Sequence, residues 1–537
     1  MQTTTTWSLP TIGALILCAA ALAACDIGTA SETALKPAAD TPAATPAAAP
    51  APGHAAAESK KPKMATEMPT GITAPAEVKT RLGTLRTIDG FPDKATIEKV
   101  YDNLDFQRGV QAVLTAMPAA SLSAMRKGLR ELGPDNQTVA IFEELMDSKT
   151  LFLTANTTTI YNFVWLNTKE GPLVIEMPPK VLGTIDNFWF NWVGDVGVTG
   201  PDKGKGGKYL LLPPDYKGSV PDGYFVMRSQ TYNHWLFFRG FLENGSPTAA
   251  DASIMKNLRI YALSEAANPP AMNFVNASGR YFNTIHSLDY SFYEEVNEVV
   301  QEEPVEASDP ETLGMLAAIG IEKGKPFNPD ARMKKILTEA AAVGNITARA
   351  LAYKSRIPEA YFYKNSGWNS PFIGGSYEFL KAKGVRNLDA RTYFFFYATG
   401  ITPAMAMKMV GKGSAYAANF VDANSDPLDG SKTYKVNLPP NVPANKFWSF
   451  TLYDNQSRSM LQTDQQLPSV GSLTKGIVMN ADKSFDVYFG PTAPVGQENN
   501  WIQTNPGRGW STILRLYGPL DPWFDKTWRP SEIELVK

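Results

Sequence analysis

The sequence predicts a mainly β protein with helical insertions, an α+β chain, and three observations lead to this class. Short runs rich in Val, Ile, Phe, Trp and Tyr fill residues 151–241 and are separated by Gly, Pro, Asp and Asn, which is typical of a sheet. Apolar residues recur at helical intervals before and after that region. The last third again alternates apolar with polar residues around turn sequences such as Asp-Asn-Gln.

The N-terminal segment ends in Leu-Ala-Ala-Cys25, the pattern of a bacterial lipoprotein signal. Residues 12–24 are apolar, too short to span a bilayer, and finish in small residues, as a cleaved export signal does. Residues 1–10 contain no Lys or Arg, which leaves a plain signal peptide or an uncleaved tether as alternatives. We expect acylated Cys25 to anchor the protein in a lipid bilayer, on the periplasmic face of the inner or outer membrane.

Composition excludes several classes of function. Both cysteines, Cys18 and Cys25, lie in the export region, so no cysteine remains for a disulfide, a thiolate metal site or a nucleophile. The 51 Lys and Arg residues nearly balance the 53 Asp and Glu residues, which gives no electrostatic footprint for nucleic acid. No apolar stretch after Cys25 approaches the roughly 20 residues of a membrane span.

Changes in composition divide the chain into six expected segments. They are a lipoprotein signal peptide (1–24), a disordered Ala/Pro-rich tether (25–65), a helical N-terminal segment (66–150), a first β domain (151–285), a helical connection (286–390) and a C-terminal β domain (391–537). The tether is inferred because Ala, Pro, Thr and Lys bury too little apolar surface to offset the entropy of ordering.

Local patterns place the elements within these segments. Residues 95–146 have helical periodicity that Pro118 is expected to break, and residues 289–352 are helical, with Ser291 and Glu294 spaced as a capping box. The expected strands are residues 159–166, 173–177, 187–193, 209–212 and 224–228, and then 447–453, 477–479, 485–489 and 511–517.

Several stretches in these β regions resemble a known pair of families. Residues 154–161, 171–177, 200–209 and 228–241 resemble the domain of unknown function numbered 1254, and residues 447–454, 500–501 and 514–519 resemble its usual C-terminal companion, numbered 1214. Together they cover most of the chain from about residue 80 to the end. The resemblance implies two jelly-roll-like β-sandwich domains with helical insertions and a homo-oligomer, but no reaction. Many members have an acidic residue where Thr158 stands here, so no carboxylate role is carried over to that position.

The usual catalytic and metal-binding motifs are missing. Residues 200–208 are rich in Gly and Lys, but their spacing does not fit a P-loop, and a solvated hairpin loop is the favoured interpretation. His234 and His286 belong to no paired zinc motif, and a structural role for His286 is favoured over a mixed site with Asp289. There is no Gly-x-Ser-x-Gly elbow. We therefore predict no cofactor and no metal.

Two clusters of aromatic residues indicate a candidate ligand-binding site. Residues 188–192 and 235–239 are expected to place aromatic side chains on both faces of their strands, so one face meets something other than the core of its own sheet. The alternatives are a subunit interface and a stacking platform for a sugar or another apolar-faced ligand, with Asn191 as one polar group. A buried Arg beside aromatic rings needs an acceptor, either a carboxylate or an anionic ligand. The candidate ligand-binding residues are Asn156, Tyr161, Asp186, Arg228 and Arg239.

Two hypotheses of function follow. The first is an exported, lipid-anchored envelope enzyme that acts on a carbohydrate or small organic molecule by carboxylate acid/base chemistry. The second is a non-catalytic envelope protein that binds a ligand or assembles into oligomers. A cavity that two carboxyl groups face would favour the enzyme, whereas a flat aromatic surface would favour assembly. The catalytic residues are unknown at this stage.

Overall fold

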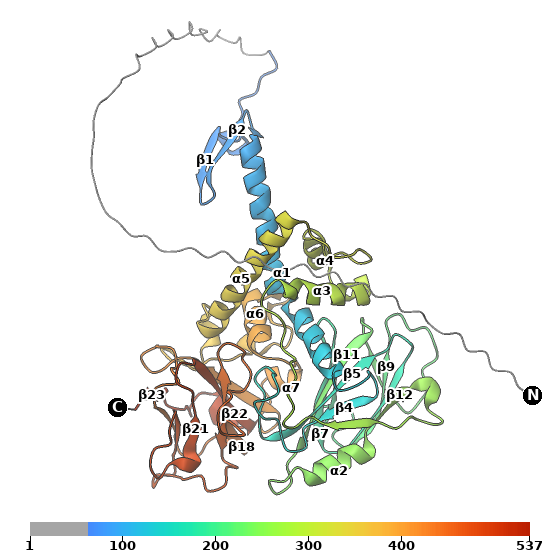
Figure 1. Ribbon diagram of the computed structural model, residues 1–537, viewed down its shortest axis with the longest axis vertical. Helices are drawn as coiled ribbons and strands as arrows, with labels where there is room; N and C mark the ends of the chain where they lie inside the picture. Colours follow the sequence, from blue (N-terminus) through green and yellow to red (C-terminus); the bar gives the residue numbers. More distant parts are fainter. Residues whose placement is uncertain (1–62, 537) are drawn as a thin grey trace, which may run out of the picture. The chain divides into compact units, whose positions relative to one another are not determined.

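The computed structural model describes residues 63–536, so Cys25, the signal peptide and nearly all of the expected tether lie outside the described residues. Contacts divide the chain into two units, residues 1–73 and residues 74–537. The described part of the first unit contains the short turn η1 (Thr70–Ile72). The second unit mixes strands and helices, which confirms the predicted α+β class (Figure 1).

The helices and strands of the second unit have the following bounds. The helices are α1 (Lys94–Arg130), α2 (Thr248–Asn257), α3 (Ser291–Glu302), α4 (Pro310–Ala317), α5 (Ala331–Tyr353), α6 (Leu388–Tyr397), α7 (Pro403–Ala406) and α8 (Asp521–Phe524). The strands before α6 are β1 (Glu77–Thr80), β2 (Gly83–Ile88), β3 (Phe91–Pro92), β4 (Thr138–Ile141), β5 (Thr159–Asn167), β6 (Leu173–Met177), β7 (Val181–Asn187), β8 (Trp192–Gly197), β9 (Gly207–Leu212), β10 (Phe225–Arg228), β11 (Asn233–Phe241), β12 (Arg259–Ala262), β13 (Asn273–Asn276), β14 (Leu380–Ala382) and β15 (Val385–Arg386). Those after α7 are β16 (Ser414–Asn419), β17 (Tyr434–Leu438), β18 (Ala444–Asp454), β19 (Ser469–Gly471), β20 (Phe485–Gly490), β21 (Trp501–Gln503), β22 (Trp510–Pro519) and β23 (Glu534–Leu535).

Strands β4 to β13 form the first β region, which contains two sheets. One has the order β13-β4-β5-β11-β7-β8 and the other β10-β9-β6-β12. Alternate residues of β5 and β11, such as Val164 and Leu236, meet Ile175 of β6 and Leu211 of β9 in one buried apolar cluster. Because strand residues alternate between faces, the intervening residues of β5 and β11 point away from this cluster.

Strands β16 to β23 form the second β region, again from two sheets. Their orders are β16-β22-β18-β19 and β21-β20-β17-β23. Phe450 of β18 and Leu514 of β22 meet Val487 and Phe489 of β20 in a second buried cluster. Each β region therefore has its own apolar core.

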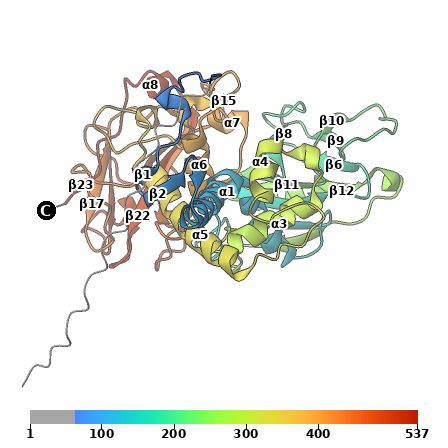
Figure 2. The same ribbon diagram turned by 90° about the horizontal axis from the view of Figure 1, so that it is seen from above.

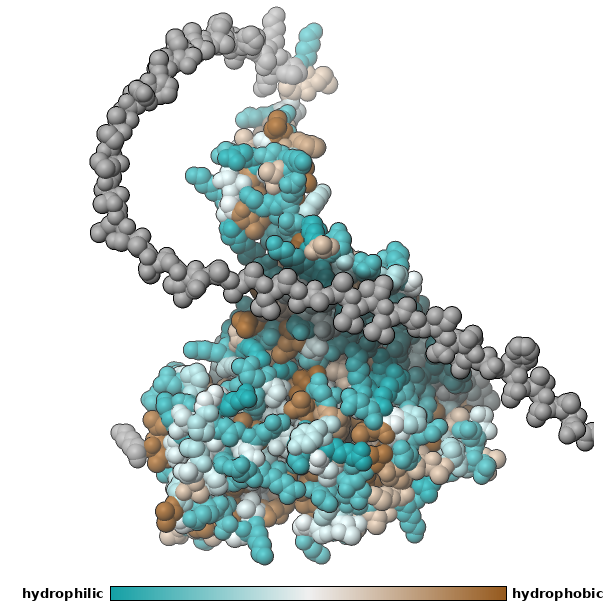
Figure 3. Space-filling model, viewed as in Figure 1, coloured by the Kyte–Doolittle hydropathy of each residue, from teal (hydrophilic) through white to brown (hydrophobic). Residues whose placement is uncertain are grey.

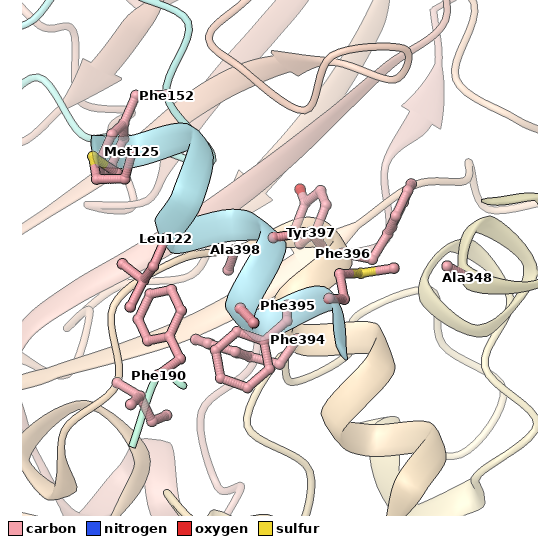
Figure 4. Close-up of a cluster of buried hydrophobic side chains, with 14 of the residues drawn as sticks. Leu122, Met125, Phe152, Phe190, Ala348, Phe394, Phe395, Phe396, Tyr397 and Ala398 are labelled. Atoms are coloured by element: carbon pink, nitrogen blue, oxygen red, sulfur yellow. The ribbon is translucent and has the colours of Figure 1, made fainter. Parts of the chain in front are cut away.

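Seen from above, helices α1, α5 and α6 lie between the two β regions (Figure 2), and in Figure 1 α5 and α6 are drawn above the second β region. The outward residues of β5 and β11, including Phe163 and Trp235, pack in the same buried cluster as α1 and α6. Figure 4 shows Leu122 of α1 and Phe190 in this cluster beside the aromatic residues of α6, and the rings of Phe190 and Phe395 are 4.9 Å apart. The second aromatic face is thus covered by the chain itself rather than by a subunit.

Helix α1 continues through Pro118, contrary to the expected break. Proline lacks the N–H that would bond to the carbonyl four residues earlier, and its ring crowds the neighbouring turn. The freed carbonyl of Leu114 accepts the Thr392 hydroxyl of α6 over 3.1 Å, and the Arg391 guanidinium of α6 donates to the neighbouring Thr115 O. A tertiary hydrogen bond thus replaces the one that proline removes.

Other local expectations are corrected. Residues 188–191 form a turn between β7 and β8 instead of a strand, because the Asn187 side chain accepts two backbone N–H groups of that turn and Phe190 adopts a φ of 59°. Residues 477–479 form no strand. The capping box at Ser291 is absent, since Asp289 accepts the Ser291 N–H instead. Strands β1 to β3 lie inside the segment expected to be helical.

The surface of the second unit is mostly polar on the face drawn in Figure 3, with apolar residues in small patches. Among residues 63–536, no helix combines the length and the hydropathy that a membrane crossing requires.

Candidate binding site between the two β regions

An Arg–Tyr pair from each β region forms the centre of the candidate site. Arg239 of β11 is the register partner of Tyr161 of β5, and Arg515 of β22 is the register partner of Tyr416 of β16. All four side chains are buried and line one cavity of about 40 Å³. Neighbouring strands thus fix both pairs, and the packing of the two β regions brings them together.

Hydrogen bonds connect the first β region to the second around this cavity. The Arg515 guanidinium donates to the Tyr453 phenol over 2.6 Å and to the carbonyl of Thr154 over 2.5 Å, and the Tyr453 phenol donates to Ala155 O over 2.5 Å. The Thr158 hydroxyl lies 3.2 Å from the Tyr517 phenol. The loop before β5 is therefore bound by side chains of β18 and β22.

Asn156 organises that loop. Its side-chain oxygen accepts the backbone N–H groups of Thr158 and Thr159 over 2.9 and 3.1 Å, and its amide nitrogen donates to the Tyr161 phenol over 2.7 Å. This is the local turn chemistry that asparagine favours before a strand. The predicted residues Asn156, Tyr161 and Arg239 all line the 40 Å³ cavity.

Tyr161, Tyr453 and Tyr517 are uncharged at neutral pH. Burial raises the pKa of Tyr161 and of Tyr453, and it raises the pKa of Tyr517 to about 12. Burial lowers the pKa of Arg239, but the adjacent phenols of Tyr416 and Tyr161 raise it further, and the net direction is upward. Both guanidinium groups are cationic, as arginine is throughout proteins.

A larger cleft of about 870 Å³ lies beside the cluster, and both β regions contribute to its walls. The first β region lines it with apolar side chains that include Val198, Phe225 and Met227, and the other wall comes from residues 403–414 and Tyr517. A narrow space of about 10 Å³ shares Thr199 and Ser414 with this cleft, and it shares Arg239 and Met405 with the 40 Å³ cavity. The cleft thus leads towards the two arginines.

Two carboxyl groups lie near the cleft in different environments. Asp195 lines the cleft, and its Oδ1 accepts the Trp192 indole N–H over 2.9 Å and the Thr402 hydroxyl over 2.6 Å. Asp186 is fully buried, and its Oδ2 accepts the Ile401 N–H over 3.1 Å. Burial raises the pKa of Asp186 well above the usual value for aspartate, which favours the protonated form of this carboxyl.

The remaining candidate residues lie elsewhere. Arg228 is exposed on β10, in the other sheet of the first β region, so the structure does not bring it to this site.

Burial lowers the pKa of His234 and of His286 to about 3, and both imidazoles are neutral. Lys203, in the Gly/Lys-rich loop of residues 200–208, reaches the rim of the cleft. Residues 63–536 contain no group of three or more His, Cys, Asp or Glu side chains that could hold a metal ion.

Sequence reasoning missed Arg515, Tyr416, Tyr453 and Asp195. The signal was available for Arg515, because it stands between Leu514 and Leu516 in a strand whose residues are all buried. A charged side chain in such a strand needs a special environment. Its carbonyl partners Thr154 and Ala155, however, lie about 360 positions earlier in the chain, and no pattern in a single sequence reveals that contact.

Comparisons with known proteins find that a part of each β region matches a family without an assigned function. Residues 136–262 match the family described as protein of unknown function (DUF1254), and residues 413–521 match protein of unknown function (DUF1214), the predicted pairing. No curated protein matches the sequence significantly.

Two solved structures are similar to this chain. The crystal structure of the VPA0106 protein from Vibrio parahaemolyticus has 18% identity and a TM-score of 0.50, and the match covers 81% of this chain and 100% of that one. An uncharacterised protein from Burkholderia cenocepacia has 12% identity and a TM-score of 0.38, with 82% of this chain and 96% of that one covered. The first of these supports the fold and no particular function.

Proposed function

We propose that this chain, in which the two family regions share one cleft, is an exported, lipid-anchored envelope protein that binds a small organic molecule in that cleft. The pattern Leu-Ala-Ala-Cys25 after a short apolar run supports export and lipidation. The cleft supports the binding function, and it is the observation on which the proposal depends.

The properties of the cleft match those of ligand sites. Its volume of about 870 Å³ lies within the range of roughly 300–1,000 Å³ that is typical of small-molecule pockets. Apolar side chains dominate its lining, and Asp195, three lysines and the Tyr517 phenol provide the charged and polar contacts that fix orientation. Its position between two β regions is also a common one for such sites.

Asp195 favours a second candidate function, an enzyme that uses carboxylate acid/base chemistry. Two donors fix its Oδ1, and no hydrogen bond within residues 63–536 reaches its Oδ2, which leaves this oxygen available to a ligand. It is, however, the only carboxyl side chain among the described residues that line the cleft. Two-carboxylate chemistry needs a second such group, so binding without catalysis is the function we favour.

Ligand capture by the full-length protein tests the proposal. Protein purified from its own envelope is expected to retain a small molecule detectable by native mass spectrometry, and adding that molecule is expected to raise the melting temperature. Val198→Trp partly fills the cleft from an exposed position and should weaken this shift, whereas Val495→Trp, at a fully exposed site outside the cleft, should leave it unchanged. Absence of any retained molecule, together with no shift in a metabolite screen, would contradict the binding function.

Asp195→Asn separates the two candidate functions. The asparagine oxygen can still accept the bonds from Trp192 and Thr402, so binding should persist. Conversion of the bound molecule by wild-type protein, and its loss in the variant, would establish the enzyme instead.

A further inference from the structure

Arg239 and Arg515 are two buried cations without a carboxylate partner. They are 5% and 3% exposed. Within residues 63–536, none of the ion pairs between basic and acidic side chains involves either of them. Their polar neighbours are phenols and, for Arg515, the backbone carbonyls of Thr154 and Ala155. All of these neighbours are dipoles rather than anions at neutral pH.

An anion would pair with both charges. Removing a cation from water costs several kcal/mol, and within residues 63–536 neither arginine has a carboxylate partner that offsets this cost. Lysine and histidine can avoid the cost by losing a proton, but arginine cannot. The two charges also come from different β regions and line the same cavity, so each adds to the positive potential that the other experiences.

The dimensions of the cavity indicate which anion fits. A water molecule needs roughly 10–15 Å³ of such space, so about 40 Å³ accommodates about three non-hydrogen atoms. A carboxylate group has three, whereas a phosphate group has five. Asn156 and Thr399 also line the cavity and can donate hydrogen bonds to the oxygens of a carboxylate.

The charge of the adjacent cleft favours the same class of ligand. Lys203, Lys412 and Lys446 line the cleft, and none of them belongs to an ion pair within the described part of the chain. Asp195 is the one acidic side chain among the lining residues of this part. A cleft with a surplus of positive charge attracts anions and accelerates their binding.

We propose that Arg239 and Arg515 bind the carboxylate of an organic acid whose apolar part occupies the 870 Å³ cleft. This inference rests on the proposed function, since it assigns the chemical class of the molecule bound there. Met405 and Arg239 line both the 10 Å³ space and the 40 Å³ cavity, and we expect the ligand to enter by a change of rotamer of the flexible Met405 side chain.

Two isosteric probes, hexanoate and hexanamide, test the charge requirement on the full-length protein by isothermal titration calorimetry. Wild-type protein is expected to bind hexanoate about tenfold more tightly than the neutral amide, the effect of one charge-assisted interaction. Equal affinity for the two probes would overturn the carboxylate assignment while leaving the cleft as a binding site. If neither probe nor any other small molecule binds, the proposed function fails instead.

Arg239→Met supplies the mutational test, with Arg228→Met as the matched control on an exposed arginine. Arg239→Met should remove the preference for hexanoate and leave the melting temperature of the ligand-free protein unchanged or higher, because a buried charge is lost. Arg228→Met should change neither. A strongly lowered melting temperature with the preference intact would show that Arg239 is structural. If Arg239→Met does not fold, the two probes still decide the question on wild-type protein.

Exchanging chloride for another anion in the binding assay tests whether the site binds an organic acid or a simple inorganic ion. Replacing chloride by methanesulfonate, a larger anion without a carboxylate group, should increase hexanoate affinity modestly, because the small chloride ion competes for the same guanidinium groups. Stabilisation by chloride that depends on Arg239, with no advantage of hexanoate over hexanamide, would overturn the proposal in favour of an inorganic anion.

Discussion

Glu295 should make the stability of this protein fall as the pH rises from about 4.5 to about 7. The side chain is 6% exposed on α3, and burial raises its pKa from 4.5 to about 7, although three hydrogen bonds from Ser287 oppose the shift. Between these two pH values the native state keeps a proton that the unfolded chain has lost. Its stability therefore decreases with rising pH and levels off above about pH 7.

The size of the effect follows from the shift in pKa. A change from 4.5 to about 7 corresponds to about 3 kcal/mol, a large part of the stability of a typical protein. Glu295→Gln resembles the protonated acid, keeps an acceptor for Ser287, and cannot ionise. We expect the variant to match wild-type protein at pH 4.5 and to be more stable by about 3 kcal/mol at pH 8.

Urea unfolding at half-unit pH intervals from 4.5 to 8 measures this difference. Other buried carboxyls, Asp186 among them, titrate equally in both proteins and cancel in the comparison. Glu294→Gln, on the exposed side of the same helix, serves as the control and should leave the pH dependence unchanged. Equal pH dependence of Glu295→Gln and wild-type protein would refute the reasoning.

Three further predictions concern the hydrogen bonds between the two β regions, a close contact between β7 and β11, and the lipid anchor. Tyr453→Phe removes the donor to Ala155 O and the acceptor for Arg515, and should cost about 1–3 kcal/mol in urea unfolding, whereas Tyr281→Phe at an exposed position should cost almost nothing. Gly183→Ala should lower the melting temperature, because a Cβ there would lie 2.3 Å from the Cβ of Phe238 in the neighbouring strand; an unchanged value would show that β7 can move away. Cys25→Ser should abolish incorporation of labelled palmitate, and labelling that persists in the variant would refute lipidation at this residue.

The strands that carry the site could be predicted because their residues alternate between two buried environments. Leu236 and Phe238 of β11 face the core of the first β region, while Trp235 and Phe237 face the helices, and the sequence shows both sets as apolar. The turn at residues 188–191 could not be recognised in this way. Its aromatic residues have the composition of a strand, but one asparagine side chain reorganises the backbone.

Only those residues of the candidate site that come from the first β region could be predicted from the sequence. Asn156 and Tyr161 are neighbours in sequence, and strand pairing adds Arg239, so local patterns indicate these three residues. The matching pair, Arg515 and Tyr416, comes from a different β region. Strand pairing within each region brings such residues together, but the docking of one region on the other depends on complementary surfaces that a single sequence does not display.

The hydrogen bonds between the loop before β5 and β22 also bear on how the chain completes its fold during synthesis. Arg515 follows Thr154, whose carbonyl it binds, by 361 positions. At about 5–20 residues per second, roughly 20 to 70 seconds pass between the synthesis of these two residues. The first β region is therefore translated in full long before the strand that caps its loop exists. Loss of the last 25 residues would remove this cap and leave the Thr154 carbonyl without its guanidinium donor, even though every residue of the first region is present.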